Sequence, residues 1–126
     1  MLSEFAENET SFLPWCTWWL THFAMLLRVF IGENDRCEGR PLYEAIVLKA
    51  REMHLAGATV LRGPMGFGHS SRLHTTKILR LSEDLPLVIE IVDSEERIKE
   101  FLPILDKIMG SGLVTLEKVK IIQYGA

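Results

Sequence analysis

Apolar residues at regular spacing divide the first half of the chain into predicted elements. Residues 26–31 are short, apolar and rich in β-branched and aromatic side chains, which predicts a buried strand. Apolar residues then recur at helical spacing behind Pro41 and ahead of Gly57, which predicts a helix near 41–55 with Gly57 as its C-terminal stop. Residues 58–62 predict a second strand.

Three further apolar runs predict strands in the second half. A glycine-rich connection over residues 63–76 comes first, with no strand predicted inside it. Residues 77–81 predict a short strand and residues 87–92 a strong one. The alternation over 113–122 predicts the last strand.

A second helix is predicted between the last two strands. Asp93 or Ser94 is expected to cap it, and Asp93 and Glu96 have the spacing of a capping box. An apolar stripe at helical spacing continues towards Gly110, where the helix is expected to end. Pro103 removes one backbone donor inside the helix, so a kink or an early end is expected there.

The resulting order is β-α-β-β-α-β, the split βαβ or ferredoxin-like pattern. This order predicts an α+β sandwich, in which two helices cover one face of an antiparallel sheet. The other face of a sheet in so small a domain also needs a cover. A sheet-to-sheet oligomer is one way to provide it.

The N-terminal part of the chain follows a different pattern. Residues 12–27 are strongly apolar, but the run is shorter than a bilayer requires, and Pro14 and His22 interrupt it. The preceding residues are acidic, which is unlike a signal peptide. We therefore expect one domain over residues 25–126, and an N-terminal extension or a miscalled start over residues 1–24.

Composition and charge narrow the class of protein. The chain has 126 residues, enough for one domain, and its formal net charge of -3 does not indicate a nucleic-acid binder. The two cysteines, Cys16 and Cys37, are too few for a disulfide framework and match no zinc pattern, so reduced thiols in the cytoplasm are expected. Between Glu52 and Glu83 no acidic residue occurs, which makes this stretch locally cationic.

The glycine-rich connection carries the candidate chemistry. Its glycines permit positive φ and close backbone approach, and successive backbone N–H groups in such turns bind anions. The flanking arginines and lysine are donors that suit phosphate. The predicted ligand-binding residues are Arg62, Gly63, Gly66, Phe67, Gly68, His69, Arg72, His74 and Lys77.

Alternatives to a small anionic ligand remain open. The loop is equally well read as a solvated segment whose charges bind nothing specific. His69 and His74 are also candidate ligands of a metal ion, or residues of a small enzyme, although no third ligand lies nearby in the sequence.

Glu90 stands within an apolar strand and is expected at a surface or interface rather than acting as a general base. We expect no catalytic activity, no cofactor and no bound metal.

Several short tracts together resemble one known family. They are Ile31-Gly32-Glu33, Gly39-Arg40-Pro41-Leu42, the stretch from Arg62 to His74, Asp84-Leu85-Pro86, Glu90-Ile91-Val92-Asp93 with Glu95 and Glu96, and Gly112-Leu113-Val114. The chain from Met25 to Tyr124 resembles the PII-like proteins classed as domain of unknown function 190.

The resemblance implies a ferredoxin-like fold, a homotrimer and a role in signalling. In PII proteins the long loop after the second strand contacts target proteins, and adenine nucleotides bind in clefts between subunits. The glycine-rich connection occupies the matching place here, so an adenine nucleotide is the implied effector. Some relatives look associated with fluoride-exporter-type membrane proteins, which implies a membrane transporter or channel as a target.

Overall fold

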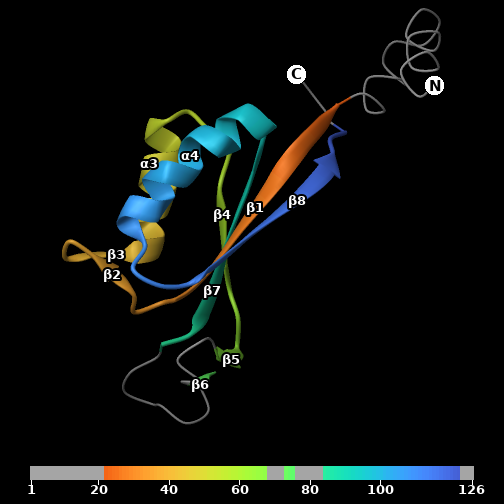
Figure 1. The fold of residues 1–126 in the computed structure, drawn as a ribbon. Coiled ribbons are helices and arrows are strands. Elements are labelled where there is room, and N and C mark those ends of the chain that lie inside the picture. The colour runs from red at the N-terminus through yellow and green to blue at the C-terminus, as the bar shows by residue number, and fades with distance from the viewer. Residues whose placement is uncertain (1–21, 68–72, 76–83, 123–126) are drawn as a thin grey trace, which may run out of the picture.

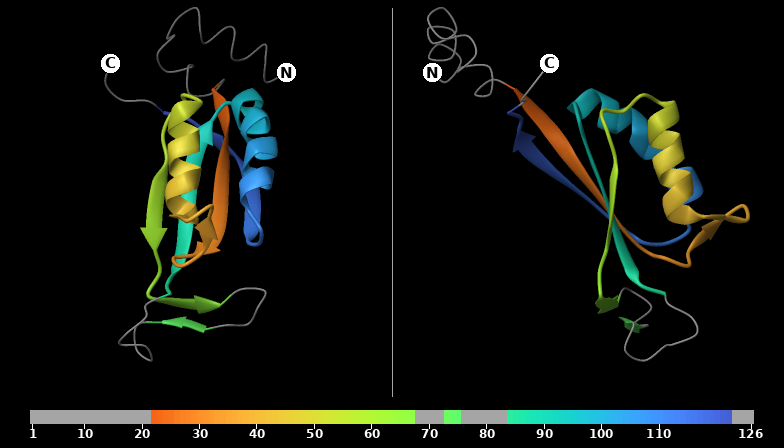
Figure 2. Two further views of the ribbon diagram at one scale, coloured as in Figure 1. Left: turned by 90° about the vertical axis from the view of Figure 1, so that its left-hand side faces the viewer. Right: turned by 180° about the vertical axis from the view of Figure 1, so that it is seen from behind.

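The computed structural model describes residues 22–67, 73–75 and 84–122. Its main elements are β1 (Phe23–Gly32), α3 (Leu42–Glu52), β4 (Thr59–Arg62), β7 (Pro86–Asp93), α4 (Glu95–Ile108) and β8 (Leu113–Lys120). The four strands form one antiparallel sheet in the order β4-β7-β1-β8. Both helices lie on the same face of this sheet (Figures 1 and 2). The predicted ferredoxin-like α+β fold is confirmed.

The core lies between the two helices and the face of the sheet that they cover. Alternate residues of β1 and β7 point into it, as the period of two in a strand requires. The helices contribute residues spaced three and four apart. The buried set includes Leu27, Val29, Ile31, Leu87, Ile89 and Ile91 from the strands, and Leu42, Ile46, Ala50, Ile98, Phe101 and Leu105 from the helices.

The first helix is shorter than predicted at both ends. Pro41 is the residue before the helix, and α3 ends at Glu52. His54 adopts a left-handed backbone conformation with φ 60°, and the amide of Leu55 donates to the carbonyl of Ala50 at 3.0 Å. This is the pattern of a Schellman turn, in which a left-handed residue closes the helix. The prediction that the helix continues to 55 and stops at Gly57 was therefore wrong.

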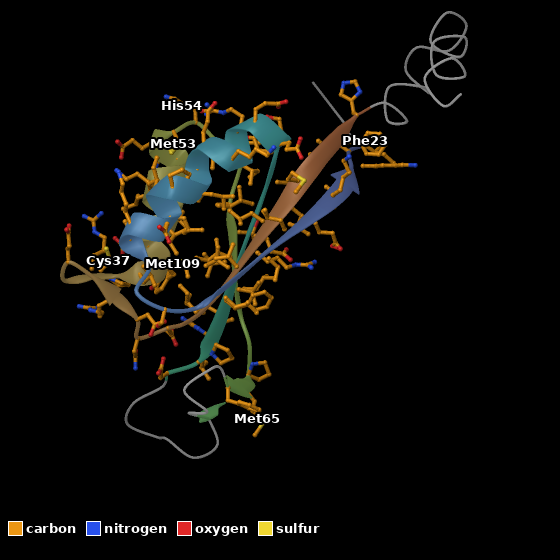
Figure 3. All side chains as sticks on the ribbon, in the orientation of Figure 1. Phe23, Cys37, Met53, His54, Met65 and Met109 are labelled. Atoms are coloured by element: carbon orange, nitrogen blue, oxygen red, sulfur yellow. The ribbon has the colours of Figure 1, made fainter. Side chains whose placement is uncertain are left out.

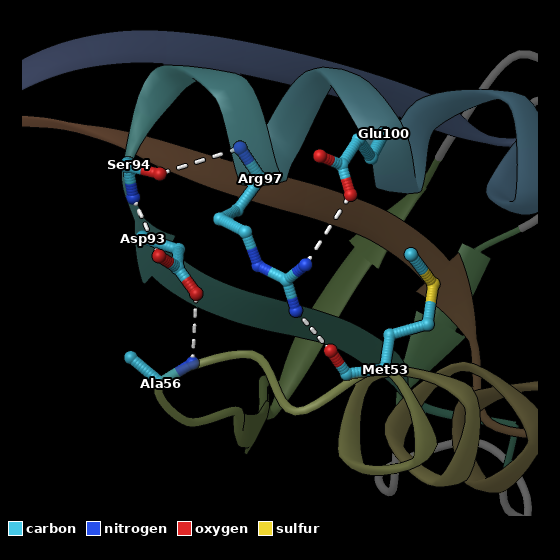
Figure 4. A network of polar contacts seen from close by, with 6 residues as sticks. All are labelled: Met53, Ala56, Asp93, Ser94, Arg97 and Glu100. Carbon is cyan, nitrogen blue, oxygen red and sulfur yellow. Dashed lines mark hydrogen bonds and ion pairs between the residues drawn. The ribbon is translucent and has the colours of Figure 1, made fainter.

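Ser94 caps the second helix, and a polar network surrounds the cap (Figure 4). The Ser94 hydroxyl accepts from the amide of Arg97 at 3.3 Å, as expected of an N-cap residue. Asp93 makes no capping box. Its carboxylate accepts from the amides of Ala56 at 2.9 Å and Ser94 at 2.6 Å. The Arg97 guanidinium donates to the Met53 carbonyl, so the network ties the end of α3 to the start of α4.

Pro103 does not end α4, which continues to Ile108. The helix interior loses the N–H that would bond the carbonyl of Lys99. Both Pro103 and Lys99 lie on the exposed side of the helix, where water can satisfy that carbonyl. Leu105 beyond the proline is buried, and its packing holds the last turn on the sheet. The expected early end at Pro103 was wrong.

Two short hairpins were not predicted. Arg36–Cys37 (β2) pairs with Arg40–Pro41 (β3), and Met65–Phe67 (β5) pairs with Leu73–Thr75 (β6) inside the connection predicted to contain no strand. The predicted strand 77–81 lies outside the described residues. The last strand ends at Lys120, two residues before its predicted end.

The first strand begins at Phe23, two residues before the predicted start of the domain at Met25. Most of residues 1–24 lies outside the described part of the chain, so the division between an extension and a domain over 25–126 stays a prediction. In the described part of the chain, no helix is long and apolar enough to cross a bilayer.

Candidate functional site

The connection between β4 and β7, which includes the glycine-rich residues 63–76 and is called the loop below, leaves the sheet at the end opposite to the start of β1. Figure 3 shows Phe23 at one end of the sheet and Met65, on the hairpin of the loop, at the other. The turn that follows β1 lies at the same end as the loop, because the amide of Glu33 donates to the carbonyl of Leu85 at 2.8 Å. The site is therefore built where the β1–β2 turn meets both ends of the loop.

Both ends of the loop are attached to this turn. At the end that follows β4, the guanidinium of Arg62 pairs with the carboxylate of Glu33. At the end that precedes β7, the amide of Asn34 donates to the carboxylate of Asp84 at 3.0 Å. Asp84 is only 4% exposed, so its carboxylate is a fixed internal anchor and not a free surface charge.

The glycines at the loop base are needed for close packing rather than for an unusual φ. A Cβ on Gly63 would lie 3.1 Å from Cγ of Pro86, and a Cβ on Gly66 would lie 3.2 Å from the same atom. Neither glycine has a positive φ. The amide of Gly63 also donates to the carbonyl of Pro86 at 2.8 Å. Of the two reasons for glycine given by the sequence, close approach applies here, and left-handed φ does not.

The structure places some of the predicted ligand-binding residues and leaves others undescribed. Arg62, Gly63 and Gly66 lie together at the loop base, and Phe67 on β5 is 71% exposed. The backbone of His74 pairs with Gly66 across the hairpin, while its side chain is not described. Gly68, His69, Arg72 and Lys77 lie outside the described residues, so their predicted roles stay predictions.

The metal-binding alternative is not tested by the described residues. Within residues 22–67, 73–75 and 84–122, no group of three potential ligands is close enough to hold a metal ion. His54, which follows α3, is exposed. His69 is undescribed, and the side chain of His74 is undescribed as well, so the pair that carried this alternative stays a prediction.

The face of the sheet away from the helices is a second candidate surface, here called the open face. Its apolar row crosses all four strands at one level, because Leu61 lies opposite Val88, Val88 opposite Phe30, and Phe30 opposite Leu113. Phe30 is 37% exposed, Leu61 48% and Leu113 58%. No described element covers this row, and adjacent exposed apolar side chains of this kind mark interaction surfaces.

A charged row lies beside the apolar row on the open face. Arg28 stands opposite Glu90 and donates to its carboxylate at 2.8 Å, and a second carboxylate, that of Glu117, lies 3.8 Å away. The hydrogen bond to Glu90, strengthened by both negative charges, raises the pKa of Arg28. Glu90 was predicted at a surface or interface, and it does lie on the open face.

A shallow hollow of about 610 Å³ lies between α4 and the start of β8. Its lining includes Leu102, Pro103, Met109 and the turn from Gly110 to Gly112. Gly112 has φ 131°, and a Cβ there would lie 2.9 Å from the carbonyl oxygen of Phe30. The sequence identified Gly110 as the helix end and Gly112 only as part of the tract Gly112-Leu113-Val114. It also missed Glu33 and Asp84 as partners of the loop, since neither pairing has a local signal.

Comparison with known proteins identifies the family of this chain. A family model, DUF190 ("Uncharacterized ACR, COG1993"), matches residues 24–121. A UPF0166 protein of Aquifex aeolicus is 42% identical over 99 residues, which cover 77% of this chain and 91% of the relative. A UPF0166 protein of Methanocaldococcus jannaschii is 36% identical over 94 residues, which cover 74% and 86%.

Two solved structures share the fold. One is CPII, a nitrogen regulatory PII-like protein from Thiomonas intermedia K12, bound to ADP, AMP and bicarbonate, with a TM-score of 0.57 and 14% identity. The other is CPII bound to ADP and bicarbonate, with a TM-score of 0.52 and 15% identity. Each match covers 81% of this chain and 91% of the solved one. At this identity the likeness concerns the fold. Together with the family match, it shows that the chain belongs to the DUF190 family and has the fold of the PII-like proteins.

Proposed function

We propose that this protein is a PII-like regulator, which binds a small anionic effector at the base of the 63–76 loop and signals to a partner through that loop. The proposed effector is an adenine nucleotide. The proposed role is regulatory and not catalytic, and the proposed location is the cytoplasm.

The observation that carries the proposal is the position of Arg62 at the loop base. Its side chain is 57% exposed and stands directly before Gly63, at the point where the loop leaves the sheet. Gly63 and Gly66 let the backbone beside Arg62 pack closely against Pro86, where a side chain would crowd the proline ring. Guanidinium is the side-chain group best suited to bidentate recognition of phosphate.

The structural neighbours support this class of ligand. CPII is bound to nucleotides and to bicarbonate, which are all anions. The loop of this chain follows the second main strand, and of the predicted cationic residues Arg72 lies in the 63–76 segment while Lys77 directly follows it. A nucleotide whose phosphates lie near Arg62 is consistent with both observations.

The hairpin and the open face support protein partners. Met65 is 55% and Phe67 71% exposed on β5, and apolar side chains displayed on a hairpin favour contact with another protein. We propose a membrane transporter or channel as that target. The apolar row of the open face is the proposed contact between copies of this chain in a homotrimer.

Thermal unfolding with ATP, ADP, AMP and cyclic nucleotides tests the proposed ligand. At least one nucleotide is expected to raise the unfolding midpoint in a saturable way, because binding to the folded state alone stabilises it. Arg62→Gln is expected to weaken that effect. Arg51→Gln, which removes an exposed arginine at the end of α3, is the matched control and is expected to leave it unchanged. A trimer that responds to none of these nucleotides contradicts the proposal.

A further inference from the structure

The ion pair between Arg62 and Glu33 joins two segments that lie 29 residues apart in the chain. Arg62 ends β4, and Glu33 follows directly after β1. The two side chains differ in exposure, since Arg62 is 57% exposed while Glu33 is only 19% exposed. The carboxylate is thus the inner partner, and the guanidinium is the outer partner, which is open to solvent.

The backbone holds Glu33 in place independently of Arg62. Its amide donates to the carbonyl of Leu85 at 2.8 Å, and the next amide, that of Asn34, donates to buried Asp84 at 3.0 Å. The amide of Gly32 donates to the carboxylate of Asp35 at 2.9 Å, which closes the turn. The backbone of Glu33 therefore stays beside the loop base, which keeps its carboxylate within reach of Arg62.

A carboxylate paired with the guanidinium that is proposed to bind phosphate has a direct consequence. A phosphate that approaches Arg62 meets the charge that already occupies part of the guanidinium. The two anions repel each other, and the guanidinium has to exchange one for the other or bind both at a cost. Ligand affinity then depends on Glu33 as well as on Arg62.

We propose that Glu33 is a built-in competitor of the anionic effector, and that the phosphate of the ligand replaces its carboxylate on Arg62. This inference rests on the proposed function, because it concerns the same site. Replacement also removes the side-chain link between the β4 end of the loop and the β1–β2 turn. The hydrogen bond from the Asn34 amide to Asp84 does not involve Arg62 and is not changed by this replacement.

Calorimetric titration of the full chain with ADP and with pyrophosphate tests this proposal. Glu33→Gln removes the charge at nearly constant shape and is expected to tighten binding about 5-fold or more, because the repulsion between the carboxylate and the phosphate is lost and the guanidinium is freed. Glu52→Gln removes the same charge from an exposed pair with Lys49 on α3 and is the matched control, with unchanged affinity expected. Glu33→Ala serves as a second variant should Glu33→Gln not fold, and the same tightening is expected.

The Arg62→Gln background separates competition from general repulsion. If Glu33 competes for Arg62, adding Glu33→Gln to Arg62→Gln tightens binding much less than it does in the wild-type chain. Equal tightening in both backgrounds, or no tightening in the wild-type chain, overturns the inference while the proposed function stands. If neither ADP nor pyrophosphate binds the wild-type chain, the proposed function and this inference fail together.

Discussion

The two faces of the sheet are built by alternate residues of the same strands, yet they differ sharply in composition. The face under the helices carries aliphatic side chains that are fully buried, such as Leu27, Val29 and Ile89. The open face carries an apolar row next to charged residues, such as Arg28 and Glu90. The face under the helices is fully covered and forms the core. The open face has apolar side chains that nothing in the described part of the chain covers.

This difference indicates what kind of cover the open face requires. A buried core excludes charge, because an ion loses its hydration there. Interfaces between proteins combine an apolar centre with polar and charged residues, which pair within or across the contact. The open face has that mixed composition, with Phe30 in its apolar row and Arg28 two residues away on the same strand and face. It suits contact with another folded copy better than coverage by a further helix of the same core.

The largest expected loss of stability follows a substitution in the core under the helices. Phe101 of α4 is fully buried against the sheet, and Phe101→Ala is expected to lower the free energy of unfolding by about 3–5 kcal/mol, as large-to-small substitutions of buried aromatic residues do. Phe30→Ala removes the same side chain from the open face, where it is 37% exposed, and is the matched control. Urea unfolding of both variants at a concentration that keeps the chain monomeric is the measurement. Equal losses contradict the assignment of the two faces.

The fold was predictable from the sequence because the main elements have a strong period. The strands around Leu27 and Ile89 and the helix around Phe101 each present a repeated apolar face, and their order alone indicates the ferredoxin-like arrangement. The short hairpins were missed, since two or three residues are too few to show alternation. The early end of α3 was missed because a left-handed conformation at His54, a residue other than glycine, leaves no clear signal.

The candidate site was only partly predictable. Arg62 and its neighbouring glycines are close together in the sequence, so the glycine-rich and cationic composition of this segment was enough to identify them as a candidate ligand site. Glu33 is brought to Arg62 by the pairing of β1 with β7 and of β7 with β4, and no local pattern reports such a tertiary contact. Asp84 was visible only as part of the tract Asp84-Leu85-Pro86, and its burial depends on the same tertiary arrangement.

An intermediate effect is expected when a charge enters the apolar row of the open face. Phe30→Lys places an ammonium between Val88 and Leu113, so it is expected to convert the proposed trimer to a monomer that is still folded. Native mass spectrometry and circular dichroism are the measurements. Leu48→Lys on α3 is the matched control, since Leu48 is 38% exposed and Phe30 is 37% exposed. A Phe30→Lys protein that remains trimeric shows that the open face is not the contact.

The smallest change in stability is expected from a substitution in the charged row. Its size depends on whether another copy of the chain covers the open face. Glu90→Gln removes the nearest carboxylate from Arg28, whose remaining charged neighbour, Glu117, is 3.8 Å away. In the Phe30→Lys monomer the pair faces water, which screens it, so the thermal unfolding midpoint is expected to change very little. In the assembled wild-type protein the same substitution leaves Arg28 poorly paired where water is excluded, and a larger fall of the midpoint is expected. Equal shifts in the two backgrounds would mean that Arg28 is as solvated in the assembly as in the monomer, and that the copies meet elsewhere.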